Sequence, residues 1–133
     1  MENIVKDMVP VLGTRADLKP EWDERRQAVH IPAIERWLDA EDLDEDDLGW
    51  EPAMIKAAKA GRRLPTREEA FALMLYAKDI NAVLVEHGHR PMSGWYWTGT
   101  AKDRRDAWYV WMPGGEVYWA DQYERRGARC LSE

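Results

Sequence analysis

The stretch Trp50–Tyr76 constrains the fold more than any other part of the chain, because it predicts two helices with a boundary signal at each end. Its first half carries apolar side chains at helical spacing, namely Trp50, Met54, Ala57 and Ala58. Gly61 follows and can end a helix in the left-handed conformation at little cost. The sequence therefore predicts a helix at about residues 50–60 that buries Trp50 and Met54.

A second helix is predicted at residues 66–77. Pro65 disfavours helix at the residue before it. Thr66, followed by Glu69 three residues later, has the pattern of a capping box. The apolar stripe of this helix consists of Ala70, Leu73, Met74 and Ala77. A shorter third helix is expected around Ile80, Val83 and Leu84, with Gly88 at its end.

After Gly94 the apolar pattern changes from helical spacing to alternation, which predicts strands. Four short strands are expected, at residues 95–98, 107–112, 116–120 and 127–131. The tripeptide at residues 113–115, Pro-Gly-Gly, predicts a hairpin between the second and third strands. The expected fold class is α+β, with two central helices packed on a small, mostly antiparallel sheet.

The first third of the chain gives weaker signals. Residues 4–12 are apolar around Pro10 and predict an edge strand or two short extended pieces. Residues 21–29 are expected to be helical around Trp22, residues 29–32 extended, and residues 33–40 helical with Ile34, Trp37 and Leu38 on one face. At 133 residues the chain is expected to form a single domain, in which residues 1–49 are an extension and acidic linker to a core at 50–131.

Four ordered blocks carry a resemblance to a known family. They are the Trp50-Glu51 helix opening with Gly-x-Arg-Leu-Pro-Thr at 61–66, then Ile80-Asn81-Ala82, then Tyr96-Trp97-Thr98-Gly99-Thr100, and then Ala107-Trp108-Tyr109-Val110 followed by Gly115. In this order they resemble the collagen-like-adhesin C-terminal (Lcl) domain and the related major paralogous domain family. The resemblance implies a C-type-lectin-like fold, in which the last strand returns beside the N-terminal one. Arg129 matches the family's last strand, whereas Trp111 stands where the family usually has a polar residue.

The net charge and its distribution indicate which kinds of binding partner to expect. The net charge is −6, and residues 1–60 hold 15 acids against 8 lysines and arginines. Nucleic acid is therefore not expected as a partner, because neutralised phosphates supply most of that affinity. Membrane insertion is not expected either, because no segment is long and apolar enough. Residues 1–13 lack the pattern of a signal peptide. The expected location is the cytoplasm or a phage particle, or an exposed surface if a signal has been removed.

Metal ions and cofactors are not expected. Seven acids at residues 39–47 suggest a calcium loop, but the EF-hand glycine position holds Asp47 and the glutamate position holds Ala53. A solvated acidic linker is the favoured interpretation. His87 and His89 lack the further ligands of a structural zinc site. The signatures of calcium-dependent sugar binding are also absent from the sequence, so binding is expected to be calcium-independent.

The candidate binding site lies on the aromatic strands. Alternation places Trp108, Val110 and Met112 on one side of their strand and Tyr109 and Trp111 on the other. Trp97 and Trp108 are expected to be core residues. The candidate ligand-binding residues are Tyr96, Tyr109, Trp111, Tyr118 and Arg104. Exposed Trp, Tyr and Arg side chains are typical of interaction surfaces. The expected function is a non-enzymatic module that binds a protein or carbohydrate ligand.

Two other function classes remain open. A related branch of the resembled fold modifies sulfatases with reactive cysteines, and this chain has one cysteine, Cys130, which also excludes an internal disulfide. No catalytic residue is predicted, because no nucleophile has an evident activating base in the sequence. The other alternative is a phage-type tail or fibre component, which would form a homo-oligomer.

Overall fold

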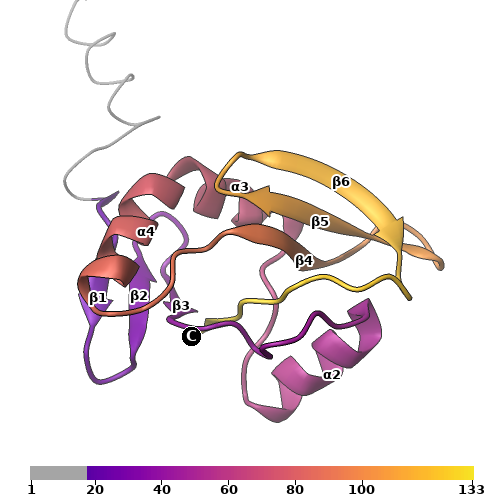
Figure 1. The fold of residues 1–133 in the computed structure, drawn as a ribbon, viewed down its shortest axis with the longest axis horizontal. Helices are drawn as coiled ribbons and strands as arrows, with labels where there is room; N and C mark the ends of the chain where they lie inside the picture. The colour runs from indigo at the N-terminus through magenta and orange to yellow at the C-terminus, as the bar shows by residue number, and fades with distance from the viewer. Residues whose placement is uncertain (1–17) are drawn as a thin grey trace, which may run out of the picture.

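The computed structural model describes residues 18–133, which contain three helices and two antiparallel sheets (Figure 1). The helices are α2 (Trp50–Lys59), α3 (Arg67–Leu75) and α4 (Ala77–Glu86). The protein therefore belongs to the α+β class, as predicted. The strand expected at residues 4–12 lies outside the described residues.

One sheet has four strands in the order β1-β2-β3-β7. They are β1 (Glu21–Asp23), β2 (Ala28–Ile31), β3 (Arg36–Asp39) and β7 (Leu131–Ser132). The helices predicted at 21–29 and 33–40 are therefore wrong. Tight turns separate the strands, and Gln27 and Glu35 adopt φ values of 50° and 52° there, which ends any helix. Cross-strand packing then decides the structure, because Val29 lies opposite Leu38 and both are buried.

The second sheet has three strands in the order β4-β5-β6. They are β4 (Gly94–Ala101), β5 (Asp106–Met112) and β6 (Glu116–Asp121). The predicted hairpin is confirmed: the Gly115 amide donates to the Trp111 carbonyl at 2.9 Å, and Gly115 has a φ of 88°. The strand predicted at 127–131 shortens to Leu131–Ser132, because Gly127 makes only an isolated bridge to Tyr96.

The helix boundaries follow the sequence signals. Gly61 adopts the left-handed conformation, with φ 70°, just after α2. Within α2 the fully buried residues are Ala53 and Ala57, whereas Trp50 and Met54 are half-buried and Ala58 is exposed. The most buried side of α2 therefore runs through Ala53 and Ala57, and the predicted burial of Trp50 and Met54 is only partial. At α3 the predicted capping box is present in full.

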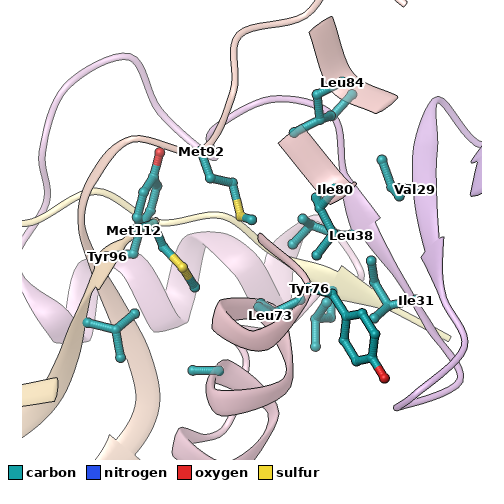
Figure 2. Packing of buried hydrophobic residues seen from close by; sticks show 14 residues of the cluster. Val29, Ile31, Leu38, Leu73, Tyr76, Ile80, Leu84, Met92, Tyr96 and Met112 are labelled. Atoms are coloured by element: carbon teal, nitrogen blue, oxygen red, sulfur yellow. The ribbon is translucent and has the colours of Figure 1, made fainter. Parts of the chain in front are cut away.

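Two buried clusters hold these elements together. The larger one lies between the four-stranded sheet, helices α3 and α4, and strands β4 and β5. Figure 2 shows Val29 and Ile31 of β2 facing Ile80 and Leu84 of α4. The smaller cluster joins α2 to Trp97 and Ala107 of the three-stranded sheet. In Figure 1 the segment after β6 runs between α2 and this sheet. The two faces of the three-stranded sheet thus pack against different cores.

Candidate functional site: an aromatic sheet face

Strand register places five aromatic residues on one face of the three-stranded sheet. Tyr109 of β5 lies opposite Trp97 of β4 and Tyr118 of β6, while Trp111 lies opposite Trp95. Residues that are directly opposite each other point to the same side of a sheet. This face is also the one that packs on the smaller core, because Trp97 and Tyr109 belong to that cluster.

Four of these rings form a continuous surface, here called the ring cluster: Trp95, Tyr109, Trp111 and Tyr118. The Trp95 ring centroid lies 4.7 Å from that of Trp111, 5.3 Å from that of Tyr109 and 5.8 Å from that of Tyr118. The centroids of Tyr109 and Tyr118 are 5.9 Å apart. Such distances lie in the range of favourable aromatic pairs. Trp95 and Tyr118 nevertheless remain 40% and 43% exposed.

Polar groups border the ring cluster on two sides. The Arg126 guanidinium carbon lies 4.5 Å from the Tyr109 ring centroid, which is a cation–π contact. Arg126 also donates to Glu124 at 2.8 Å. The Tyr118 hydroxyl donates to Glu116 at 3.0 Å. That hydrogen bond to a carboxylate raises the pKa of Tyr118, so the phenol stays neutral. The surface can therefore offer ring faces together with both signs of charge.

Trp111 rests on the hairpin that follows its strand. It is half-buried, and its ring lies directly over the hairpin at Gly114. A Cβ atom added at Gly114 would lie 2.5 Å from Cδ1 of Trp111. The absence of a side chain at Gly114 thus lets the ring settle against the turn and support Trp95.

The structure brings Tyr109, Trp111 and Tyr118 together, as the alternation predicted. It does not bring Tyr96 to them. Tyr96 lies opposite Val110, points to the other face of the sheet and is only 7% exposed within the larger core. Burial raises the pKa of its phenol. Its expected place in an exposed patch is therefore corrected, because the register of β4 turns its side chain inward.

Arg104 also lies away from the ring cluster. It belongs to the turn between β4 and β5 and is exposed, whereas Trp111 lies at the opposite end of β5, next to the hairpin. Sequence reasoning missed two members of the surface, Trp95 and Arg126. Alternation could have identified Trp95, since it lies two residues before Trp97 in the same strand. Arg126 follows the strands in an irregular segment, so no periodic pattern marked it.

The two rings expected in the core differ in their burial. Trp97 is 1% exposed, and its indole NH donates to the Leu48 carbonyl at 2.8 Å. Trp108 is only partly buried on the opposite face of the sheet. The Arg67 guanidinium carbon covers it at 4.7 Å, and the Trp119 ring packs edge-on at 5.4 Å. Trp97 is thus a true core residue, whereas Trp108 belongs to the boundary.

The acidic segment is tied to the rest of the protein by ion pairs. Asp42 accepts a hydrogen bond from Nε of Arg129 at 3.0 Å, and Asp44 pairs with Lys56. Arg129 is only 4% exposed and also donates to the Ala40 carbonyl at 3.1 Å. The arginine that matches the resembled family's last strand thus anchors the acidic segment.

The two histidines serve as packing partners in the structure. The His87 and His89 rings lie 4.5 and 5.3 Å from the Trp22 ring. Within residues 18–133 no group of three His, Cys, Asp or Glu side chains has the arrangement of a metal site.

Cys130 lies in the smaller core beside the last strand. It is 1% exposed. Burial, with a smaller contribution from the nearby Asp39 carboxylate, raises the pKa of its thiol to about 12. Since the thiolate is the nucleophilic form, this cysteine is chemically unreactive in the folded protein at neutral pH.

No family model matches the chain, and no curated protein matches it. None of the helices within residues 18–133 has the length and apolar character needed to cross a membrane. The fold and the ring cluster together define an α+β domain with an exposed aromatic sheet face.

Proposed function

We propose that this protein is a non-enzymatic binding module that docks a protein ligand on the ring cluster without calcium. One observation carries the proposal: Trp95 packs against the other three rings of the cluster, yet Trp95 and Tyr118 are 40% and 43% exposed. A contiguous patch of exposed rings is typical of an interaction site.

The proposal includes a C-type-lectin-like fold of the Lcl and major paralogous type. Three features support it. The last strand, β7, pairs with β3 of the N-terminal sheet. The helices α2 and α3 are joined by the Gly-x-Arg-Leu-Pro-Thr segment, and a separate three-stranded antiparallel sheet follows them. These features agree with the order of blocks that carries the resemblance.

A protein ligand is favoured over a glycan by the composition of the surface. Trp, Tyr and Arg are the residues that contribute most to protein–protein hot spots. Here Arg126 stacks on Tyr109 while its guanidinium is held by Glu124, so little side-chain freedom is left to lose on binding. Sugar binding through stacked rings is the competing outcome, and the experiment below separates the two.

The test compares two exposed tryptophans on opposite faces of the sheet. Trp95→Ala removes a central ring of the cluster and is expected to weaken binding to a captured, purified partner by about 2 kcal/mol or more. Trp119→Ala is the matched control, because Trp119 is 52% exposed and lies on the other face. It should leave affinity unchanged.

Both variants are first checked for an unchanged circular dichroism spectrum, and affinities are then measured by calorimetry. Equal losses in the two variants would contradict the proposed site. A glycan array provides the second arm. Retention of one glycan by the wild type and its loss in Trp95→Ala would replace the protein ligand with a carbohydrate.

An assembly component is a second candidate, and one observation favours it. Strand β6 lies at the edge of its sheet and carries Tyr118 on one face and Trp119 on the other, both exposed. Such an edge can pair with a strand of another copy. Sedimentation at several concentrations tests a phage-type structural role: a stable oligomer supports it, and a monomer at all concentrations contradicts it.

The sulfatase-modifying alternative depends on a reactive cysteine. The burial of Cys130 and its thiol pKa of about 12 count against that chemistry, so we do not propose it.

A further inference from the structure

A second surface, separate from the ring cluster, lies where α2 meets the end of β6. It is an open groove of about 800 Å³, bordered by the start of α2, the turn between β4 and β5, and the segment that follows β6. Three arginines line it: Arg104 and Arg105 from the turn, and Arg125 from the segment after β6. Sequence positions 20 residues apart thus contribute to one groove, here called the arginine groove.

The three guanidinium groups of the arginine groove have no carboxylate partner among residues 18–133. Other arginines of the protein differ: Arg62 pairs with Asp39 at 3.2 Å, Arg63 with Glu69 at 2.6 Å, and Arg129 with Asp42 at 3.0 Å. Arg105 lies near Asp103 of the same turn: backbone hydrogen bonds, and to a smaller extent the charges of Lys102 and Arg105, lower the pKa of that carboxyl. In a protein with a net charge of −6, three arginines thus line one groove without a close ion pair to any described residue. An anionic partner could accept hydrogen bonds from their guanidinium groups.

Two acids also line the groove, Glu51 and Asp121. Asp121 already accepts a hydrogen bond from the Tyr123 amide at 2.8 Å. Glu51 lies in the first turn of α2, where the helix dipole favours a negative charge. Three arginines against two acids give the lining a net positive charge, and within residues 18–133 their guanidinium groups donate no hydrogen bond to a carboxylate.

Backbone contacts fix the shape of the groove. The Gln122 amide donates to the Arg105 carbonyl at 2.8 Å, and the Trp50 amide donates to the Gln122 carbonyl at 2.9 Å. The Gln122 side chain donates to the carbonyls of Asp103 and Asp106, at 3.2 Å each. One residue thus ties the β4–β5 turn, the segment after β6 and α2 together. A groove that is already formed costs little ordering on binding.

Apolar surface lies between the charges. Tyr123 lines the groove and is 93% exposed, and Ile55 of α2 lines it and is 46% exposed. A ligand that covers Tyr123 could therefore bury almost the whole surface of this side chain. A simple inorganic anion could not use this area, whereas a peptide could cover it with an apolar side chain.

We propose that the arginine groove binds an acidic peptide segment of a partner protein, with carboxylates on Arg104, Arg105 and Arg125 and an apolar side chain against Tyr123 and Ile55. This site does not depend on the ring cluster, so the two proposals can fail separately.

The probe is a fluorescein-labelled heptapeptide of sequence Asp-Glu-Leu-Glu-Asp-Leu-Glu, followed by fluorescence anisotropy with the full chain. Binding should weaken as salt rises, because exposed ion pairs are screened. Replacing all acids of the peptide with Asn and Gln should abolish binding. Equal binding of the neutral peptide would overturn the proposal.

Variants then locate the site. The triple variant Arg104→Ala, Arg105→Ala, Arg125→Ala should bind the acidic peptide at least about tenfold more weakly, the sum of three modest exposed ion pairs. The matched control removes three exposed basic side chains elsewhere: Lys59→Ala, Lys78→Ala, Arg90→Ala. This control variant has the same net charge as the triple arginine variant and should bind the peptide as tightly as the wild type does. Equal weakening in both triples would show non-specific attraction and overturn the proposal.

Two further measurements address the remaining alternatives. Tyr123→Ala should weaken the leucine-containing peptide but not a version with both leucines replaced by serine. If inorganic phosphate, at the peptide's total carboxylate concentration, displaces the peptide fully, the groove is a simple anion site and the peptide proposal is wrong. Trp95→Ala should bind the peptide normally, which separates this site from the ring cluster.

Discussion

The Arg63 guanidinium donates a hydrogen bond to each carboxylate oxygen of Glu69, with Nη1 2.6 Å from Oε1 and Nη2 2.7 Å from Oε2. Oε1 also accepts a hydrogen bond from the Thr66 amide at 2.9 Å, and the Thr66 hydroxyl accepts one from the Glu69 amide at 3.1 Å. The loop after α2 is thereby clamped to the first turn of α3. Sequence predicted the capping box but not the arginine that completes it.

Loss of the Thr66 hydroxyl should destabilise the protein. Thr66→Ala removes the N-cap acceptor of α3 and is expected to cost about 1 kcal/mol of unfolding free energy. Urea denaturation measures the loss as a lower midpoint at constant slope. Thr66→Ser keeps the hydroxyl and should stay within a few tenths of a kcal/mol of the wild type. An unchanged midpoint for Thr66→Ala would rule out a stabilising cap.

Glu69 should make stability acid-sensitive. The hydrogen bonds from Arg63 are the main cause that lowers the Glu69 pKa below its ordinary value of 4.5. A carboxyl with a lowered folded pKa contributes stability above its unfolded pKa and loses it as pH falls through the folded value. Glu69→Gln should therefore be less stable than the wild type at pH 7, with the difference shrinking below about pH 4.5.

Denaturant unfolding at a series of pH values measures that difference. Glu68→Gln is the control, because the Glu68 side chain is 71% exposed and its nearest arginine nitrogen is 3.8 Å away. Glu68 lies in the first turn of α3, so this change should cost only the modest helix-dipole contribution, below about 1 kcal/mol at pH 7. A Glu69→Gln difference that does not depend on pH would show that the stabilisation has another origin.

Gly114 and Trp111 should be energetically coupled. Because an added Cβ would lie 2.5 Å from the Trp111 ring, Gly114→Ala must displace that ring, at a cost of roughly 1–3 kcal/mol. In a Trp111→Ala background the same change should cost much less. A double-mutant cycle of denaturation free energies measures the coupling. Equal costs in both backgrounds would mean that the ring does not rest on the turn.

Cys130 should be protected from thiol reagents. With a thiol pKa of about 12 and 1% exposure, modification requires the protein to open. Labelling with a chromogenic disulfide at pH 8 is expected to be slow in buffer and to reach one thiol per chain rapidly in denaturant. The Cys130→Ser variant, which has no thiol, gives the background signal. Rapid stoichiometric labelling of the native protein would show that the thiol is accessible.

Calcium should leave the thermal midpoint unchanged. Asp42 and Asp44 are already paired with Arg129 and Lys56, so the acidic segment has neutralising partners of its own. A ligand present at 100 times its dissociation constant would add about 2.7 kcal/mol, which is a shift of several degrees. Differential scanning fluorimetry in millimolar calcium and in chelator makes the comparison. A reproducible calcium-dependent rise would establish a site in the acidic segment.

Sequence predicted the parts of the fold that local signals determine. Gly61, Thr66 and Gly88 mark helix ends, and Gly115 marks the hairpin, because each signal works through the residue's own backbone preference or a neighbour a few positions away. The helices predicted at residues 21–29 and 33–40 were wrong, because the turns between the strands hold Gln27 and Glu35 at positive φ. The extended segment predicted at residues 29–32 overlaps β2. Neither Gln nor Glu favours that conformation, so no turn signal marked the short connections that pair β1 with β2 and β2 with β3.

The candidate site was predictable to the same extent. Period-two alternation was enough to pair Tyr109 with Trp111. It could not show that Tyr96 lies opposite Val110, because register between strands is a property of the folded sheet. Arg126 reaches Tyr109 from an irregular segment that crosses the sheet, and Arg104 meets Arg125 only once the groove has formed. Contacts of this kind carry no short-range sequence signal.

The pairing of β7 with β3 can form only after residues 131–132 have been synthesised. Leu131 is fully buried, lies opposite Leu38 and exchanges backbone hydrogen bonds with Arg63 at 2.8 and 3.1 Å. During synthesis β3 emerges about 90 residues before this partner (residues 36–39 against 131–132). Throughout that interval the outer edge of β3 has no neighbour and the larger core lacks Leu131. The nascent chain therefore carries an open sheet edge, the kind of surface that chaperones shield during translation.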